Sequence, residues 1–198
     1  MSVSHPYADR KTASVRHAAD FAFPLLVPYY AAAMEHLWSP WRLAYILGTE
    51  PATGCVFCHA LADPEADRLI VFRGATCFVI LNLFPYNNGH LMVIPNRHIA
   101  TLASATPEEL AELMELTRRS EIALTEAYAP HGMNMGINLG RPAGAGVLDH
   151  LHMHIVPRWN GDTNFITVIG RTRVLPEDLP AAADKLRPIF ERLASSGA

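Results

Sequence analysis

Three histidines alternate with three apolar residues in the stretch D-H-L-H-M-H-I-V-P-R-W, residues 149–159. The members of this alternation are His150, Leu151, His152, Met153, His154 and Ile155. Successive side chains of a β-strand point to opposite faces, whereas a helix would spread the imidazoles around its surface. The alternation therefore predicts a strand over 150–156, with its apolar side on a core and its histidines facing outward or into a cleft. Because imidazole titrates near neutral pH and binds metals, such a row indicates a functional surface.

The composition limits the classes of partner that suit this chain. Its 198 residues are 50% hydrophobic, which suits one compact domain with a core large enough to fold alone. With 16 basic and 19 acidic residues the net charge is −3, so binding to a nucleic acid polymer is not expected. A single nucleotide needs only a few local donors and stays possible. No apolar run has the length of a transmembrane helix, so we expect no membrane partner.

The first 33 residues differ in character from the rest. They contain the apolar segment F-A-F-P-L-L-V-P-Y-Y-A-A-A at 21–33. A secretory signal cleaved after A-A-A is one interpretation, but the two prolines and the neighbouring Asp20 disfavour it. We expect a leader of uncertain order over 1–33, or a true start at Met34, followed by a single domain over 34–198.

Turn signals divide that domain into strand-like runs and two long helices. The runs lie at 69–72, 77–81, 90–95, 132–139 and 150–156. The first helix begins at T-P-E-E, where Thr106 is the N-cap, Pro107 takes the first position and Glu109 completes a capping box. Its apolar stripe consists of Leu110, Leu113, Met114, Leu116 and Ile122. A second helix spans about 177–194, and the order of elements predicts an α+β fold in which helices cover one face of an antiparallel sheet.

The pair Cys55 and Cys58 in G-C-V-F-C is half of a typical zinc site. The chain has three cysteines, an odd number that does not suggest a disulfide framework, and Cys77 lies in an apolar run as a core residue would. His98 and His150 are natural complements, but spacing alone does not identify the histidine ligands. Two alternatives remain: ordinary reduced cysteines, or an all-histidine metal site made by H-x-H on the predicted strand.

A glycine-rich loop, G-R-P-A-G-A-G at 140–146, leads directly into the histidine row. Glycines such as Gly144 and Gly146 let backbone N–H groups approach an anion closely. Such a loop alone is usually only a turn. Imidazole, however, can attack phosphorus and form a covalent intermediate, while backbone donors stabilise the charge on the phosphoryl oxygens. Loop and histidines together favour phosphate chemistry.

The run H-L-H-M-H-I-V resembles the H-x-H-x-H-x-x signature, with x apolar, of the histidine-triad (HIT) superfamily of nucleotide hydrolases and transferases. N-N-G-H-L-M-V-I-P at 87–95 resembles the G-H-x-x-V-x-P strand of that family. W-S-P-W-R-L-A-Y-I at 38–46, L-N-L-F-P-Y-N-N-G-H at 81–90 and P-R-W-N-G-D-T-N-F at 157–165 are similar to the bacterial diadenosine tetraphosphate phosphorylase branch. The resemblance covers about 37–165 and implies a HIT-like α+β fold.

The resemblance also implies a role for individual residues of the site. His152 matches the nucleophile that is nucleotidylated on the α-phosphate. His154 and His90 match histidines that line the same phosphate site. Asn138 matches a polar residue that contacts the phosphates, and Asn82 matches the position that binds the ribose.

Zinc-containing relatives imply a metal site made from a Cys-x-x-Cys pair, a histidine after the G-H strand and the first triad histidine. The matching residues are Cys55, Cys58, His98 and His150. Four protein ligands fill a tetrahedral shell, so this zinc is expected to be structural. An oxidising compartment would favour a disulfide between the two cysteines, so the expected compartment is the cytoplasm.

The expected function is cleavage of a nucleoside phosphoanhydride through a nucleotidyl-histidine intermediate in a homodimeric enzyme, with diadenosine polyphosphates as favoured substrates. One position departs from the pattern, because Gly146 stands where many members carry serine or glutamine. The acceptor of the second step, whether phosphate, water or another group, therefore stays open. The alternatives are a nucleoside phosphoramidase, a hydrolase of adenylylated small molecules, or a non-catalytic nucleotide-binding zinc module.

Overall fold

The fold is described from a computed structural model, and the residues described are 54–63, 66–170 and 175–196. The expected leader over 1–33, the alternative start at Met34 and the tryptophan-rich motif at 38–46 lie outside these residues. No helix in the described ranges combines the length and the apolar character that crossing a bilayer requires.

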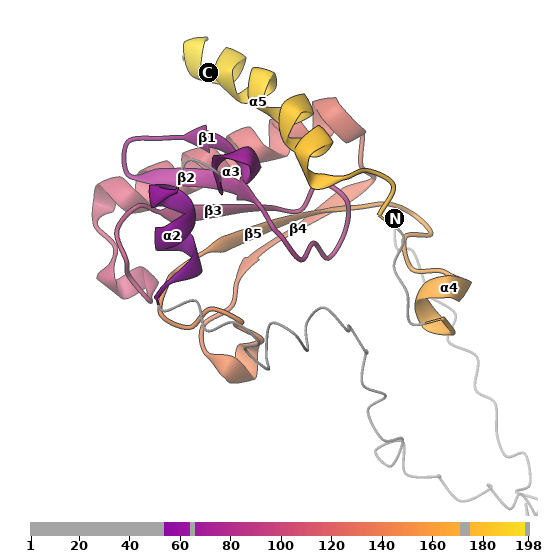
Figure 1. The fold of residues 1–198 in the computed structure, drawn as a ribbon, viewed down its shortest axis with the longest axis horizontal. Helices are drawn as coiled ribbons and strands as arrows, with labels where there is room; N and C mark the ends of the chain where they lie inside the picture. Colours follow the sequence, from indigo (N-terminus) through magenta and orange to yellow (C-terminus); the bar gives the residue numbers. More distant parts are fainter. Residues whose placement is uncertain (1–53, 64–65, 171–174, 197–198) are drawn as a thin grey trace, which may run out of the picture. The chain divides into compact units, whose positions relative to one another are not determined.

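Five antiparallel strands form one sheet in the order β1-β2-β3-β5-β4 (Figure 1). The strands are β1 (Ile70–Arg73), β2 (Cys77–Leu81), β3 (Leu91–Pro95), β4 (Gly132–Ile137) and β5 (Met153–Arg158). The α+β class and the strand count are confirmed. The strand expected over 150–156 begins later, at Met153, because its ladder with β4 ends where Ile137 pairs with Met153. On the other side β3 ends at Pro95, which has no N–H to donate.

Alternate side chains of the sheet belong to two different apolar clusters. One face packs against α3 (Pro107–Tyr128) and α5 (Leu179–Ser195). The buried strand residues of that face include Val79, Leu81, Leu91, Val93 and Ile155. The sequence predicted helices on one face only, but the short helix α2 (Val56–Ala62) covers the opposite face (Figure 1).

The face under α2 carries the imidazoles. Phe78, Ile80, Met92 and Ile94 point to this face and pack with Phe57 of α2. His90, directly before β3, and His154 on β5 point to this face, because the residues that follow them, Leu91 and Ile155, belong to the core on the other face. A single alternation therefore separates the apolar core from the histidines.

Both long helices begin at caps that the sequence encodes. At α3 the Thr106 hydroxyl accepts the Glu109 N–H at 3.3 Å, and the Glu109 carboxylate accepts the Thr106 N–H at 2.8 Å, which confirms the capping box. At α5 the Asp178 carboxylate accepts the Ala181 N–H at 2.8 Å. The remaining helical turns are α4 (Phe165–Val168) and the 3-10 turns Ala66–Leu69, Leu102–Ser104 and Arg141–Ala143.

The apolar stripe predicted for α3 is only partly right. Leu113 and Leu116 are buried as expected, but Leu110 and Met114 are 36% and 57% exposed. The helix instead buries two hydroxyl residues and two further residues, Thr117, Ser120, Ala123 and Leu124. Both hydroxyls donate to the carbonyl four residues earlier at 2.7 Å, so their burial leaves no donor unsatisfied. The buried face of α3 therefore differs from the predicted one.

Candidate active site and metal centre

Four histidines are buried together on the α2 face of the sheet. His90, His150, His152 and His154 are 0%, 1%, 4% and 9% exposed, so the row is not a solvated strand surface. His152 and His154 stand edge to face, with ring centroids 4.8 Å apart, and His90 and His154 have centroids 5.1 Å apart. Such packing requires that each ring has a defined hydrogen-bond partner.

His152 presents one nitrogen to the backbone and leaves the other free to react. Its Nδ1 lies 2.8 Å from the carbonyl oxygen of His150. A carbonyl oxygen only accepts, so Nδ1 carries the proton and donates it, and Nε2 holds the lone pair. Burial lowers the pKa of His152, while the hydrogen bond to His150 opposes that shift. The ring is therefore neutral at neutral pH, with a nucleophilic Nε2.

A second pair of rings is fixed from the loop before β3. The backbone N–H of Tyr86 donates to His90 Nδ1 at 3.0 Å, so His90 carries its proton on Nε2. That nitrogen donates to His154 Nδ1 at 3.0 Å, which leaves the proton of His154 on its own Nε2. Burial, with smaller contributions from neighbouring imidazoles, lowers the pKa of His90 to about 3 and that of His154 to about 4. The two rings thus form a neutral chain that ends in an N–H donor.

His90 is fully buried and reaches the proposed phosphate site through its neighbour His154. Its ring centroid lies 5.1 Å from that of His154, and its Nε2 donates to His154 Nδ1. Asn82 lies beside it, with Nδ2 3.3 Å from His90 Nδ1 and with Oδ1 accepting the Phe84 N–H at 2.9 Å. His90 therefore fixes the ring of His154, and Asn82 contacts His90.

Two supporting residues, Asn87 and Asp162, were missed by the sequence interpretation. The buried Asn87 amide donates to the Pro157 carbonyl and to the Asp162 carboxylate, both at 2.9 Å. Asp162 also accepts two hydrogen bonds from Arg158, which lower the pKa of the Asp162 carboxyl. These contacts tie the loop before β3 to the end of β5. Both residues stand in runs that the family resemblance quoted, N-N-G-H and W-N-G-D, but neither was given a role of its own.

The glycine-rich loop contains a turn whose amides are partly engaged. Gly144 has φ +89°, a left-handed conformation that favours glycine, and a Cβ there would lie 3.9 Å from Asn138 Nδ2. The N–H groups of Ala143, Gly144 and Ala145 donate to carbonyls within the turn. Gly146 is exposed two residues further along. The structure thus brings Asn138 and Gly144 together and shows that the Gly144 amide already has a partner.

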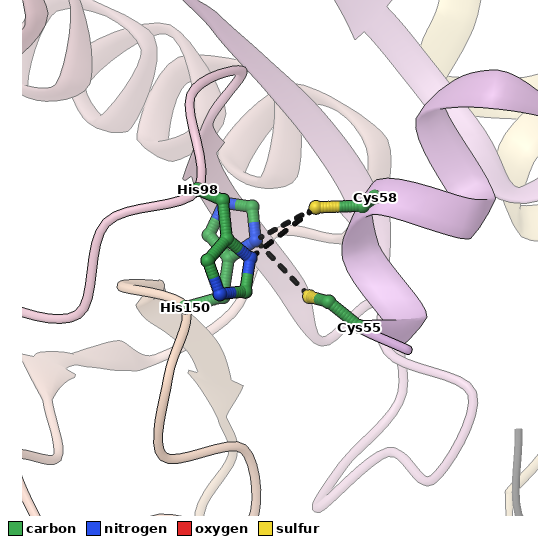
Figure 2. A group of neighbouring side chains, drawn as sticks. All are labelled: Cys55, Cys58, His98 and His150. Atoms are coloured by element: carbon green, nitrogen blue, oxygen red, sulfur yellow. Dashed lines mark hydrogen bonds between the residues drawn. The ribbon is translucent and has the colours of Figure 1, made fainter. Parts of the chain in front are cut away.

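The four predicted metal ligands come together from three separate segments. Their ligand atoms all lie within 4.8 Å of one another (Figure 2). Cys55 Sγ is 3.2 Å from His150 Nδ1, and Cys58 Sγ is 3.3 Å from His98 Nδ1 and 3.6 Å from His150 Nδ1. Around a tetrahedral zinc, sulfur and nitrogen ligands are separated by about 3.3–3.8 Å. The four side chains therefore fit a zinc ion.

A neighbouring carbonyl orients the first triad histidine for that role. His150 Nε2 lies 2.8 Å from the carbonyl oxygen of Pro95, so Nε2 carries the proton and Nδ1 faces the sulfurs. Metal-bound histidines commonly donate their second nitrogen in this way. Cys55 is the N-cap residue of α2, and His98 follows β3, so the site joins the helix to the sheet.

Comparison with known proteins matches this chain to a protein family. The HIT domain family model matches residues 63–161. The AP-4-A phosphorylase of Mycobacterium tuberculosis is 41% identical over 154 residues, which cover 73% of this chain and 78% of that protein. The adenylylsulfatase HINT3 of Arabidopsis thaliana is 32% identical over 108 residues, or 54% of each chain.

A solved structure is similar in fold and in sequence. It is a Zn-bound histidine triad family protein from Mycobacterium smegmatis, with a TM-score of 0.58 and 32% identity, covering 72% of this chain and 97% of that one. The family model, the mycobacterial relatives and the buried triad agree, and the chain belongs to the HIT family.

Proposed function

We propose that this HIT protein cleaves a phosphoanhydride bond of a dinucleoside polyphosphate in two steps, through a nucleotide bound covalently to His152. The single observation that carries the proposal is the hydrogen bond from His152 Nδ1 to the His150 carbonyl, because it leaves the lone pair on Nε2. The 41% identity to a mycobacterial AP-4-A phosphorylase supports this substrate class.

In the first step Nε2 of His152 attacks the α-phosphorus, and the bond from phosphorus to the leaving oxygen breaks. The leaving nucleotide takes the bonding electron pair, and the N–H of His154 donates a hydrogen bond toward it. The His152 ring gains positive charge as the P–N bond forms. The His150 carbonyl, which accepts the Nδ1 proton, stabilises that charge. His90 acts through His154, because its Nε2 donates to His154 Nδ1.

In the second step an acceptor attacks the same phosphorus and the P–N bond breaks. With diadenosine tetraphosphate and phosphate, transfer of the AMP group to phosphate gives ADP, and the leaving group of the first step is ATP. We assign Asn138 and the loop with Gly144 and Gly146 to the phosphates, with the amides after Ala145 as the donors, and Asn82 to the nucleoside side. The proximity of Asn138 to Gly144 supports the first of these assignments.

We assign Cys55, Cys58, His98 and His150 to a structural zinc. When bound, zinc supplies a cross-link between α2 and the sheet, because four protein ligands leave no open coordination position. Reduced cysteines suit a reducing compartment, so the proposed location is the cytoplasm.

We also propose a homodimer that forms through β4. This strand ends the sheet order among the described residues, so one of its edges has no partner strand there. Met135 on β4 and Leu139 beyond it are 41% and 47% exposed. An exposed strand edge with apolar neighbours is suited to pairing with a second copy. Sedimentation of wild type and Met135→Arg tests this: a wild-type monomer would contradict the dimer.

Product analysis on diadenosine tetraphosphate, with and without phosphate, tests the function. A phosphorylase gives ADP and ATP only when phosphate is present. AMP and ATP without phosphate would indicate a hydrolase. Faster turnover of adenylyl sulfate, the substrate class suggested by the Arabidopsis relative, would move the assignment to adenylylated small molecules. Nucleotide binding without any product would indicate a non-catalytic nucleotide-binding module.

A further inference from the structure

Phe57 lies between the two cysteines of α2 and packs on two triad histidines. It is 6% exposed. Its ring centroid lies 5.6 Å from that of His150, with the ring planes at 88°, and 5.0 Å from that of His152, with the planes at 54°. The same side chain therefore contacts one ring of the proposed metal site and one ring that is the proposed nucleophile.

The position of this side chain bears directly on the orientation of His152. Rotation of an imidazole about its χ2 bond has broad minima, so packing must select one orientation. On one side the Nδ1 proton is held by the His150 carbonyl at 2.8 Å, and on another the ring meets His154 edge to face. Phe57 supplies a third contact, with ring centroids 5.0 Å apart, to a ring that is only 4% exposed.

The helix that carries Phe57 has little stability of its own. It has seven residues, which is too short for an isolated helix to persist in water. It is held at Cys55 and Cys58, on either side of Phe57, by contacts with His98 and His150. Below Phe57 lies the apolar cluster of Ile70, Phe78, Ile80, Met92 and Ile94. Metal ligands thus fix the helix at the two positions that bracket the aromatic ring.

We propose that Phe57 is a positioning residue that holds the His152 imidazole in its attacking orientation, and that it thereby connects the metal-holding helix to nucleotidyl transfer. The inference rests on the proposed function, in which His152 is the nucleophile. It adds a second connection between the two sites, besides the short chain path from His150 to His152.

The test compares Phe57→Leu with Phe78→Leu. Phe78 is fully buried in the same apolar cluster, and its ring pairs with no imidazole in the described part of the chain. Both substitutions remove a similar apolar volume, so both should lower the melting temperature and keep stoichiometric zinc. Phe57→Leu should slow covalent nucleotidylation by about tenfold to a hundredfold, with KM nearly unchanged, because a small misplacement of a reacting group has effects of that size. Phe78→Leu should stay within about twofold of wild type.

Imidazole nitrogen NMR provides a readout that does not depend on turnover. In the wild type, His152 should show a protonated Nδ1 and an unprotonated Nε2. In Phe57→Leu the two nitrogen shifts should move toward each other as the ring samples other orientations, while Phe78→Leu should match the wild type. Unchanged His152 shifts and an unchanged nucleotidylation rate in Phe57→Leu would overturn the proposal, as would equal effects of both variants. If the wild type itself forms no nucleotide adduct, the proposed function fails, and the positioning of a nucleophile by Phe57 fails with it.

Discussion

The two faces of the sheet carry different kinds of side chain on the same strands. On one face Val79, Leu91 and Ile155 pack under two long helices and form an apolar core. On the other face, against which the short helix α2 packs, the neighbouring positions carry His90 and His154. Alternation along a strand thus separates groups that stabilise the fold from groups that carry chemistry, only one residue apart. Substitution of a triad histidine and substitution of a core residue on the helical face should therefore affect different measurements.

The largest expected effect is that of His152→Ala on the chemical rate. Removal of the nucleophile should lower the rate of nucleotidyl transfer by at least ~10³, or about 4 kcal/mol of barrier, while the nucleotide still binds. Rapid-quench kinetics and equilibrium binding measure the two quantities. His154→Ala should lower the rate of nucleotidyl transfer less, because it removes a hydrogen-bond donor and not the attacking atom. The matched control is His131→Ala, which removes a histidine outside the triad, directly before β4.

Leu186→Ala should show the opposite behaviour. Leu186 is fully buried on α5, so its truncation should lower the free energy of unfolding by about 2–5 kcal/mol. The turnover number per folded molecule should stay close to wild type, because the residue belongs to the helical face of the sheet. Urea unfolding and active-site titration check both statements. A large loss of turnover with little loss of stability would contradict the separation of the two faces.

Cys55→Ser should affect stability through the metal. The variant should lose most of its zinc, and its melting temperature should fall by about 5–10 °C, the shift that a loss of 2–3 kcal/mol produces in a chain of this size. Metal analysis of protein purified without chelators tests the loss of zinc, and calorimetry tests the fall in melting temperature. Wild-type protein without zinc, or with a disulfide between Cys55 and Cys58 when isolated from its own cell, would refute the assignment.

The pH dependence of stability should reveal the neutral histidine pair. His90 and His154 have pKa values of about 3 and about 4, below the ordinary value near 6.5, so the unfolded chain binds protons more readily. Their contribution is complete above pH 6.5 and is lost as the pH falls toward these values, by up to about 1.4 kcal/mol per pH unit for each ring. Urea unfolding between pH 7.5 and 4.5, measured in the metal-free Cys55→Ser background, should show this loss; constant stability would contradict neutral burial.

The sequence was sufficient for features that depend on local chemistry. The cap at Thr106 follows from residue types and spacing, and the side chains of the metal site follow from spacing and the family signature. It could not predict what covers the histidines, because alternation assigns a side chain to a face and says nothing about α2, which follows from tertiary packing.

Other features depended on pairing between distant segments. The late start of β5 at Met153 depends on where its partner strands end, and Pro95 stands in one of them. The hydrogen bonds from His90 to His154 and from Asn87 to Asp162 join residues more than 60 positions apart. No local pattern encodes such contacts. The exposure of Leu110 and Met114 on α3 likewise follows from which side of the helix meets the sheet.

The most direct test of the account is to trap the nucleotide on the enzyme. Wild-type protein, mixed with labelled diadenosine tetraphosphate and quenched within milliseconds, should carry an acid-labile, base-stable AMP group. Peptide mapping at alkaline pH should place it on Nε2 of His152, because Nδ1 is occupied by the hydrogen bond to His150. His152→Ala should carry none. Label on another residue, or near-normal turnover by His152→Ala, would contradict the account and favour direct attack by the acceptor.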